Sequence, residues 1–78
     1  MEYQPEPDAA GHQYIEVSFE DGSDALLRLT YINKDNANSS VRINKIIPGG
    51  APFPGPEPEL SKIPLIVEAL MKIYNDHS

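Results

Sequence analysis

The fold is decided by the stretch QYIEVSFEDGSDALLRLTYIN, residues 13–33. Apolar and polar residues alternate in its first part, and the large apolar ones share one parity: Ile15, Val17 and Phe19. A second alternating run carries a matching parity: Ala25, Leu27, Leu29 and Tyr31. Strict alternation is typical of half-buried strands. The stretch therefore predicts two antiparallel strands, at about residues 13–20 and 25–33.

The turn between these strands must keep the apolar residues on one face. A three-residue loop, residues 20–22, pairs Val17 with Ala25 and keeps the two apolar parities together. A two-residue loop would mix the faces, because a shift of one residue turns every side chain over. The longer loop also places Gly22 where a left-handed residue closes a type I turn. We therefore predict the three-residue loop.

A third strand is expected at about residues 40–47, with Val41 and Ile43 on the core parity. Lys45 shares that parity, so we expect the strand to bulge or end there. The connections between the three strands are too short for parallel crossovers. The simplest arrangement is therefore an antiparallel meander.

The last part of the chain predicts one helix, at about residues 61–76. Its apolar residues recur at spacings of three and four, and they are Ile63, Ile66, Val67, Leu70, Ile73 and Tyr74. Ser61 is a suitable N-cap, and Pro64 would lie in the first turn, where its missing N–H costs little. Three further residues widen this apolar surface: Leu65, Ala69 and Met71. They either cover the sheet edge or contact a second chain.

The predicted fold is α+β, a three-stranded antiparallel β-meander with one C-terminal helix packed on one face. The expected core joins the helix to one side of the sheet: Ile15, Val17, Phe19, Leu27, Leu29, Tyr31, Val41 and Ile43. Residues 12–78 form this single domain. Residues 1–11 are acidic and proline-bearing, so we expect a flexible tail, or a segment that folds onto a partner around Tyr3. A domain this small often gains stability from an interface.

A proline-rich strap, residues 48–60, links the third strand to the helix. Its prolines at 52, 54, 56 and 58 are two apart, whereas the SH3-binding pattern needs prolines three apart. Residues that precede proline favour extended backbone. We therefore expect a stiff strap that sets the position of the helix, with Phe53 anchored in the core. An exposed Phe53 would make the strap a candidate binding segment.

Charge and composition exclude several classes of function. The net charge is −6, and residues 1–24 hold seven of the twelve acidic residues and none of the six basic ones. This asymmetry opposes direct nucleic-acid binding. The chain has no cysteine, which excludes disulfides and thiolate sites and favours a reducing cytoplasm. No signal-peptide pattern and no apolar run long enough for a membrane span is present.

The sequence offers no catalytic or metal-binding pattern. His12 and His77 belong to no metal-spaced cluster or triad. Glu16 and Glu20 share a strand face but lie about 13 Å apart at roughly 3.3 Å per residue. Glycosidase carboxylate pairs are separated by only about 5–9.5 Å. We therefore expect no enzyme, no cofactor and no metal.

Protein binding is the class of function that remains. The sheet face away from the helix mixes aromatic, aliphatic and arginine residues, as protein interfaces do. The expected partner-binding residues on this face and the acidic hairpin are Tyr14, Glu16, Glu20, Asp21, Asp24, Leu26, Arg28, Ile32 and Arg42. Single exposed aliphatic residues are also common, so a merely solvated face is the simpler alternative.

Two functions follow from this expectation. The first is a non-catalytic regulator or inhibitor that docks on a larger protein. In its sharper form, by analogy with acidic phage inhibitors of host defence nucleases, it occupies a basic nucleic-acid-binding surface of its partner. The second is a structural or accessory subunit that homodimerises, or completes a larger assembly, through the open sheet face.

Overall fold

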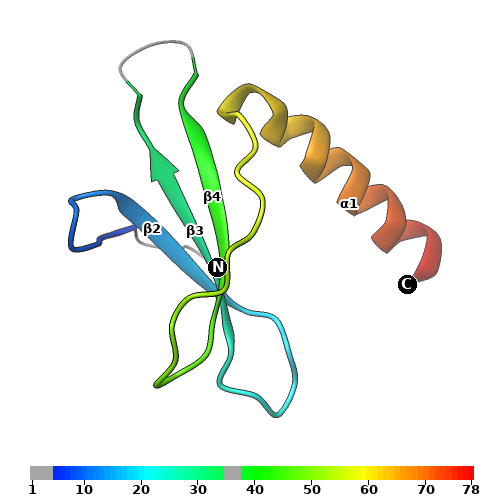
Figure 1. Ribbon diagram of the computed structural model, residues 1–78. Helices are drawn as coiled ribbons and strands as arrows, with labels where there is room; N and C mark the ends of the chain where they lie inside the picture. Colours follow the sequence, from blue (N-terminus) through cyan, green and yellow to red (C-terminus); the bar gives the residue numbers. More distant parts are fainter. Residues whose placement is uncertain (1–4, 35–37) are drawn as a thin grey trace.

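The computed structural model describes residues 5–34 and 38–78. An antiparallel sheet is followed by a strap and a C-terminal helix (Figure 1), which confirms the expected α+β class. The strands, in their order across the sheet, are β1 (Glu6–Pro7), β2 (Gln13–Ser18), β3 (Leu26–Ile32) and β4 (Ser40–Ile46). A short 3₁₀ helix, η1 (Leu60–Lys62), leads into α1 (Ile63–His77).

The sheet has four strands rather than the three expected. The additional strand is β1, in which Glu6 lies opposite Tyr14 of β2. This strand falls inside residues 1–11, which the composition predicted to be a flexible tail. Residues 1–4, including the alternative centred on Tyr3, lie outside the described part of the chain.

Asp8 organises the turn between β1 and β2. Its Oδ1 atom accepts hydrogen bonds from the backbone N–H groups of Ala10 (2.9 Å) and His12 (2.8 Å). Gly11 supplies a left-handed backbone with φ of 85°. Desolvation raises the pKa of the Asp8 carboxyl, but the two N–H groups, together with the nearby His12 and Arg28 side chains, hold the pKa below its ordinary value. A turn held by side-chain-to-backbone hydrogen bonds reverses the chain but leaves no apolar pattern in the sequence. The sequence pattern therefore did not predict β1.

The faces of β2 and β3 are as predicted, but their register is shifted by two residues. Val17 lies opposite Leu27 rather than Ala25, so the connecting loop is longer than the three residues expected. Gly22 has the predicted left-handed backbone, with φ of 72°. The Ala25 N–H donates to Ser23 Oγ at 3.0 Å, and Ala25 is only 4% exposed. A shift of two keeps every side chain on its face, so parity could not detect it.

β4 continues through Lys45 to Ile46, so the strand neither bulges nor ends at Lys45 as predicted. Lys45 keeps its place opposite Leu27 in the regular ladder. Its Nζ atom lies 3.4 Å from the Glu20 carboxylate and 5.6 Å from the centre of the Phe19 ring. The Glu20 carboxylate and the Phe19 ring stabilise the Lys45 ammonium at the end of the sheet. The strand can therefore stay regular at this position.

The strap runs along the outer edge of β4. The Pro56 carbonyl accepts from the Ile43 N–H, and the Pro58 carbonyl accepts from the Val41 N–H, each at 3.0 Å. Proline has no N–H to donate, so these residues pair with β4 only as acceptors. A side chain at Gly55 would collide with the Ile43 carbonyl oxygen. Glycine therefore permits the close approach of the strap to the strand.

Phe53 is not the core anchor that we predicted. Its side chain is 51% exposed. Its backbone N–H donates to the Lys45 carbonyl at 2.9 Å, and its own carbonyl accepts from Asn44 Nδ2 at 2.9 Å. Phe53 thus fastens the strap through its backbone, and the ring stays at the surface as part of a candidate binding segment.

α1 starts beside β4 and then slants away from the sheet (Figure 1). The Leu60 N–H donates to the Ser39 carbonyl at 2.8 Å, which fixes the start of η1 at the edge of the sheet. Pro64 lies in the first turn of α1, as predicted. Ser61 falls within η1, so Lys62 and not Ser61 is the N-cap residue. The predicted close packing of the helix on the sheet is not seen.

The predicted core is half open. The most buried described residues lie elsewhere: Ala25, Thr30, Ile32 and Ser40. Most of the predicted core side chains are half-buried, and Phe19 and Tyr31 are 43% and 40% exposed. The Cα radius of gyration is 13.7 Å, whereas a compact domain of this length has roughly 11.5 Å. The sheet and the helix therefore leave apolar surface uncovered between them.

Candidate functional site: an apolar groove and two charge clusters

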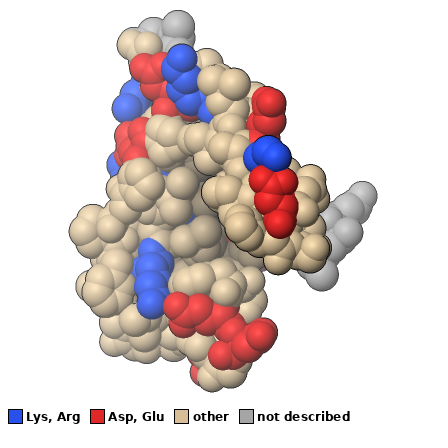
Figure 2. All heavy atoms as spheres, turned by 90° about the vertical axis from the view of Figure 1, so that its right-hand side faces the viewer, with Lys and Arg blue, Asp and Glu red and all other residues tan. Residues whose placement is uncertain are grey.

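An apolar groove with a volume of about 430 Å³ lies between the sheet and α1. The sheet wall is formed by residues of three strands: Ile15, Leu27, Leu29, Tyr31, Val41 and Ile43. The helix wall is formed by the first turns of α1: Ile63, Ile66, Val67 and Leu70. Figure 2, which looks from the helix side, shows charged residues mostly toward the two ends of the molecule and along α1, with uncharged surface between them.

The groove is built from the two periodicities of the sequence. Antiparallel pairing places Ile15 opposite Leu29, and Leu29 opposite Ile43, so one apolar row crosses three strands. Side chains of a strand alternate between faces, which collects this parity on the side of α1. The spacing of three and four in α1 turns its own apolar stripe toward the same space. Both walls are the faces that the sequence marks for burial.

Much of the apolar surface of α1 is exposed. Leu70, Ile73 and Tyr74 of the stripe are 60%, 61% and 61% exposed. On other sides of the helix, Leu65 and Met71 are 60% and 49% exposed. Contiguous apolar surface of this kind marks interaction sites in soluble proteins. The groove and α1 together are therefore the main candidate binding surface.

The opposite face of the sheet carries the first charge cluster. Arg28 donates to Glu16 Oε2 from Nη2 (2.9 Å) and from Nε (3.1 Å). The Arg28 guanidinium also lies 4.4 Å from the centre of the Tyr14 ring. Three of the predicted partner-binding residues are thus brought together, as their shared parity implied. They are already paired with one another by charge-assisted hydrogen bonds and a cation–π contact.

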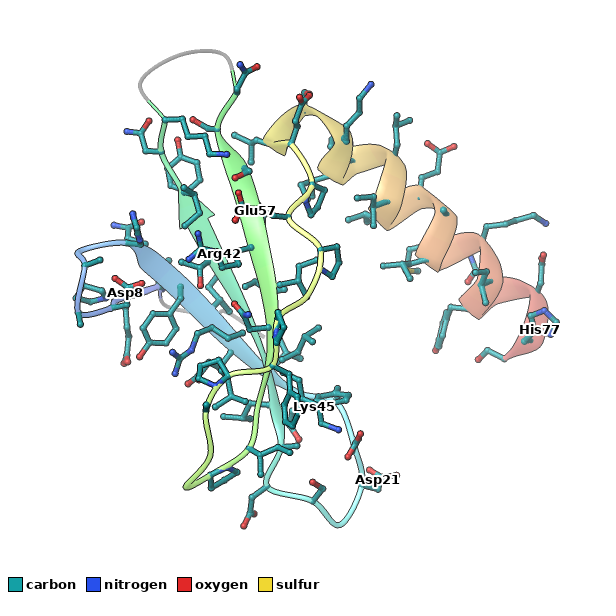
Figure 3. All side chains as sticks on the ribbon, viewed as in Figure 1. Asp8, Asp21, Arg42, Lys45, Glu57 and His77 are labelled. Carbon is teal, nitrogen blue, oxygen red and sulfur yellow. The ribbon has the colours of Figure 1, made fainter. Side chains whose placement is uncertain are left out.

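The second charge cluster centres on Glu57 of the strap. Its carboxylate accepts from Arg42 Nε (2.9 Å), Ser40 Oγ (3.0 Å) and Lys34 Nζ (3.2 Å). These hydrogen bonds, that of Arg42 first, lower the pKa of Glu57 from 4.5 to about 2. Figure 3 shows Glu57 and Arg42 close together beside β4. The predicted binding residue Arg42 is thus engaged within the chain.

Glu57 was not among the residues predicted to matter. The one signal that pointed to it was its place between two prolines of an extended strap, 15 residues beyond Arg42. Extended geometry fixes the alternation of side chains along the strap, but it does not show which strand the strap lies against. The sequence alone therefore could not show that Glu57 lies beside Arg42.

The remaining predicted residues lie on β3 or in the loop between β2 and β3. Ile32 is 7% exposed and belongs to the interior, while Leu26 is half-buried. Glu20, Asp21 and Asp24 are exposed in the loop between β2 and β3. Figure 3 places Asp21 at the opposite end of the sheet from Arg42. By register, six of the nine residues share the opposite sheet face (Tyr14, Glu16, Leu26, Arg28, Ile32 and Arg42), whereas Glu20, Asp21 and Asp24 lie in the separate acidic loop.

Two kinds of feature are absent from residues 5–34 and 38–78. No group of three or more His, Asp or Glu side chains in these ranges could hold a metal ion. None of the helices in the same ranges is long and apolar enough to cross a membrane.

No protein-family model, no curated protein and no solved structure matches this chain. The geometry of the groove is therefore the basis on which a function can be proposed. The groove is lined mainly by aliphatic side chains and the Tyr31 ring, and Pro5, Gln13 and the predicted binding residue Tyr14 also line it. A surface of this composition binds by excluding water from a complementary apolar surface.

Proposed function

We propose that this chain is a non-catalytic protein-binding module whose binding surface is the groove between the sheet and α1. The observation that carries the proposal is the apolar groove of about 430 Å³, walled by three strands and a helix. Grooves of this kind accept the apolar face of an amphipathic helix, with anchors at spacings of three and four. The groove replaces the opposite sheet face as the expected contact surface.

The internal pairing of the charged residues supports this choice of surface. Arg28 is held by Glu16, and Arg42 is held by Glu57, at 2.9 Å in each case. A partner that docked on that face would have to break these pairs or leave them desolvated, which opposes binding. A partner that docks in the apolar groove does not break or desolvate these ion pairs.

More specifically, we propose that the chain acts in the cytoplasm as a regulator or inhibitor of its partner. The exposed acidic loop with Glu20, Asp21 and Asp24 lies at one end of the sheet. Its charge would steer the module toward a partner with a basic surface and would reject acidic ones. The lack of cysteine fits a reducing compartment.

Two matched substitutions in α1 test the groove. Leu70 lines the groove, whereas its neighbour Ala69 lies on the outer side of the helix. Leu70→Glu places a carboxylate in the apolar contact, and Ala69→Glu adds the same group outside it. Burying an unpaired charge is costly, so we expect Leu70→Glu to weaken partner capture by at least about tenfold.

The measurement is affinity capture from the native cells with the wild type and both variants, after circular dichroism has confirmed that each is folded. Partners retained by the wild type and by Ala69→Glu, but lost by Leu70→Glu, support the groove. Capture of the same partners by all three proteins would show that the groove is not the binding surface.

A further inference from the structure

The groove and α1 are complementary in length and in chemistry. The stripe from Ile63 to Tyr74 is about 17 Å long at roughly 1.5 Å per residue. The central strand β3, seven residues long, covers about 20–23 Å at roughly 3.3 Å per residue. Both surfaces are apolar, and both are open, since Leu70 of the helix is 60% exposed and Tyr31 of the sheet is 40% exposed. The chain therefore carries an unfilled groove together with an element that could fill one like it.

The strap holds α1 away from its own sheet. It is bonded to β4 through the carbonyls of Pro56 and Pro58, and the Leu60 N–H continues this contact to Ser39. The start of the helix is thereby fixed at the outer edge of β4, and the helix slants outward from that point (Figure 1). A helix that arrives from another molecule is not subject to this constraint.

The charge distribution allows α1 to approach a second copy. Between residues 60 and 77, two basic and two acidic residues cancel: Lys62, Lys72, Glu68 and Asp76. Lys72 is paired with Asp76 at 2.9 Å, and Lys72 and Glu68 line the outer side of the helix. The acidic excess of the chain lies in residues 1–24, so the neutral helix meets little repulsion in the groove of another copy.

The exposed apolar area of the stripe contributes much of what a stable dimer needs. Four large side chains of the stripe of α1 are between 51% and 61% exposed: Val67, Leu70, Ile73 and Tyr74. At roughly 150–200 Å² for a large side chain, they expose on the order of 350–450 Å². Each copy offers a sheet wall in addition to its helix, which brings its contribution toward the roughly 800 Å² of a standard interface.

We propose that the occupant of the groove is a second copy of this chain, with α1 of each copy seated in the groove of the other. The inference rests on the proposed function, because it names the partner for the same groove. The exchange is two-fold symmetric and therefore closes without leaving a free surface for further copies. It supplies the shared core that neither copy builds alone.

The first test is the molar mass of the full chain in solution. Light scattering at micromolar concentration is expected to give about twice the 8.6 kDa of one chain. Leu70→Glu should return the mass to that of one chain, and Ala69→Glu should keep the dimer. A wild type that is monomeric at every concentration overturns the inference. A dimer that only Ala69→Glu dissociates also overturns it, because the contact would then lie on the outer side of α1.

The second test locates the contact by disulfide formation. The chain has no cysteine, so introduced cysteines report on a single pair of positions. Leu29→Cys on the sheet wall and Val67→Cys on α1 are made in separate molecules and mixed under mild oxidation. If α1 of each copy lies in the groove of the other, most disulfide-linked dimers contain one Leu29→Cys molecule and one Val67→Cys molecule. These mixed dimers should be in several-fold excess over dimers of two identical variants. An excess of dimers of identical variants would contradict the proposed arrangement.

A double variant, with Leu29→Cys and Val67→Cys in the same chain, separates the two proposals. A disulfide formed within one chain would mean that α1 fills its own groove, and then the dimer and the groove-binding function both fail. A monomer that forms no such disulfide, yet still captures another protein in a Leu70-dependent way, removes the dimer and leaves the binding function in place.

Discussion

Replacement of Gly55 by alanine tests how the strap is fitted to β4. The added Cβ would collide with the carbonyl oxygen of Ile43, which is held in the sheet. The strap must therefore move away from the strand. The nearest bonds that this movement weakens are the Ile43 N–H to the Pro56 carbonyl (3.0 Å) and the Phe53 N–H to the Lys45 carbonyl (2.9 Å).

The size of the effect follows from these two bonds. A backbone hydrogen bond contributes about 0.5–1.5 kcal/mol net, so two weakened bonds cost about 1–3 kcal/mol. Alanine also restricts the unfolded chain relative to glycine, which returns about 0.4–1 kcal/mol. We expect Gly55→Ala to lower the free energy of unfolding by about 1–2 kcal/mol.

Gly50→Ala is the matched control for this experiment. A Cβ at Gly50 would lie 3.5 Å from the Ile47 carbonyl oxygen, an ordinary contact distance. The control should therefore be neutral or stabilised by up to about 1 kcal/mol. Urea unfolding followed by circular dichroism, at one fixed protein concentration, measures both variants. Equal stability of the two variants would refute the close approach of the strap.

Two further predictions concern the charge clusters. The pKa of Glu57 is about 2 in the folded chain against an ordinary 4.5, so its stabilising contribution is complete above about pH 4.5 and is lost as the pH falls toward about 2. The difference in thermal stability between the wild type and Glu57→Gln should therefore shrink over this interval, and a constant difference would contradict the pairing. A double-mutant cycle of Glu16→Gln and Arg28→Met should give a coupling of about 0.5–1 kcal/mol that weakens in high salt. A coupling of zero would show that the pair is not formed in solution.

The faces of the sheet could be predicted from the sequence, whereas the pairing of its strands could not. Alternation is a local property, and it placed Val17 and Leu27 on one face correctly. The register depends on the course of the whole loop between them, and a shift of two residues leaves the alternation unchanged. β1 was missed for a related reason. Its composition is that of a tail, and only the hydrogen bonds of Asp8 turn it back onto β2.

The candidate site was likewise predictable from the sequence only in part. Tyr14, Glu16 and Arg28 could be grouped in advance because they share a face of adjacent strands. The partnership of Arg42 with Glu57 could not, because it depends on the tertiary position of the strap. Apolar periodicity predicted a covered face on both the sheet and α1, but it does not specify whether the cover comes from the same chain or from another one.

The structure shows why the apolar faces of the sheet and α1 are not fully covered within one chain. The alternating prolines favour extended backbone over residues 51–58, and the bonds of Pro56 and Pro58 to β4 carry that segment along the edge of the sheet instead of across its face. A helix that starts from an edge can cover the face only by turning back sharply. α1 slants outward instead and leaves the row of Ile15, Leu29 and Ile43 open. The strap thus determines that the apolar faces of the sheet and the helix meet only in part, and the open remainder is the surface available to a partner.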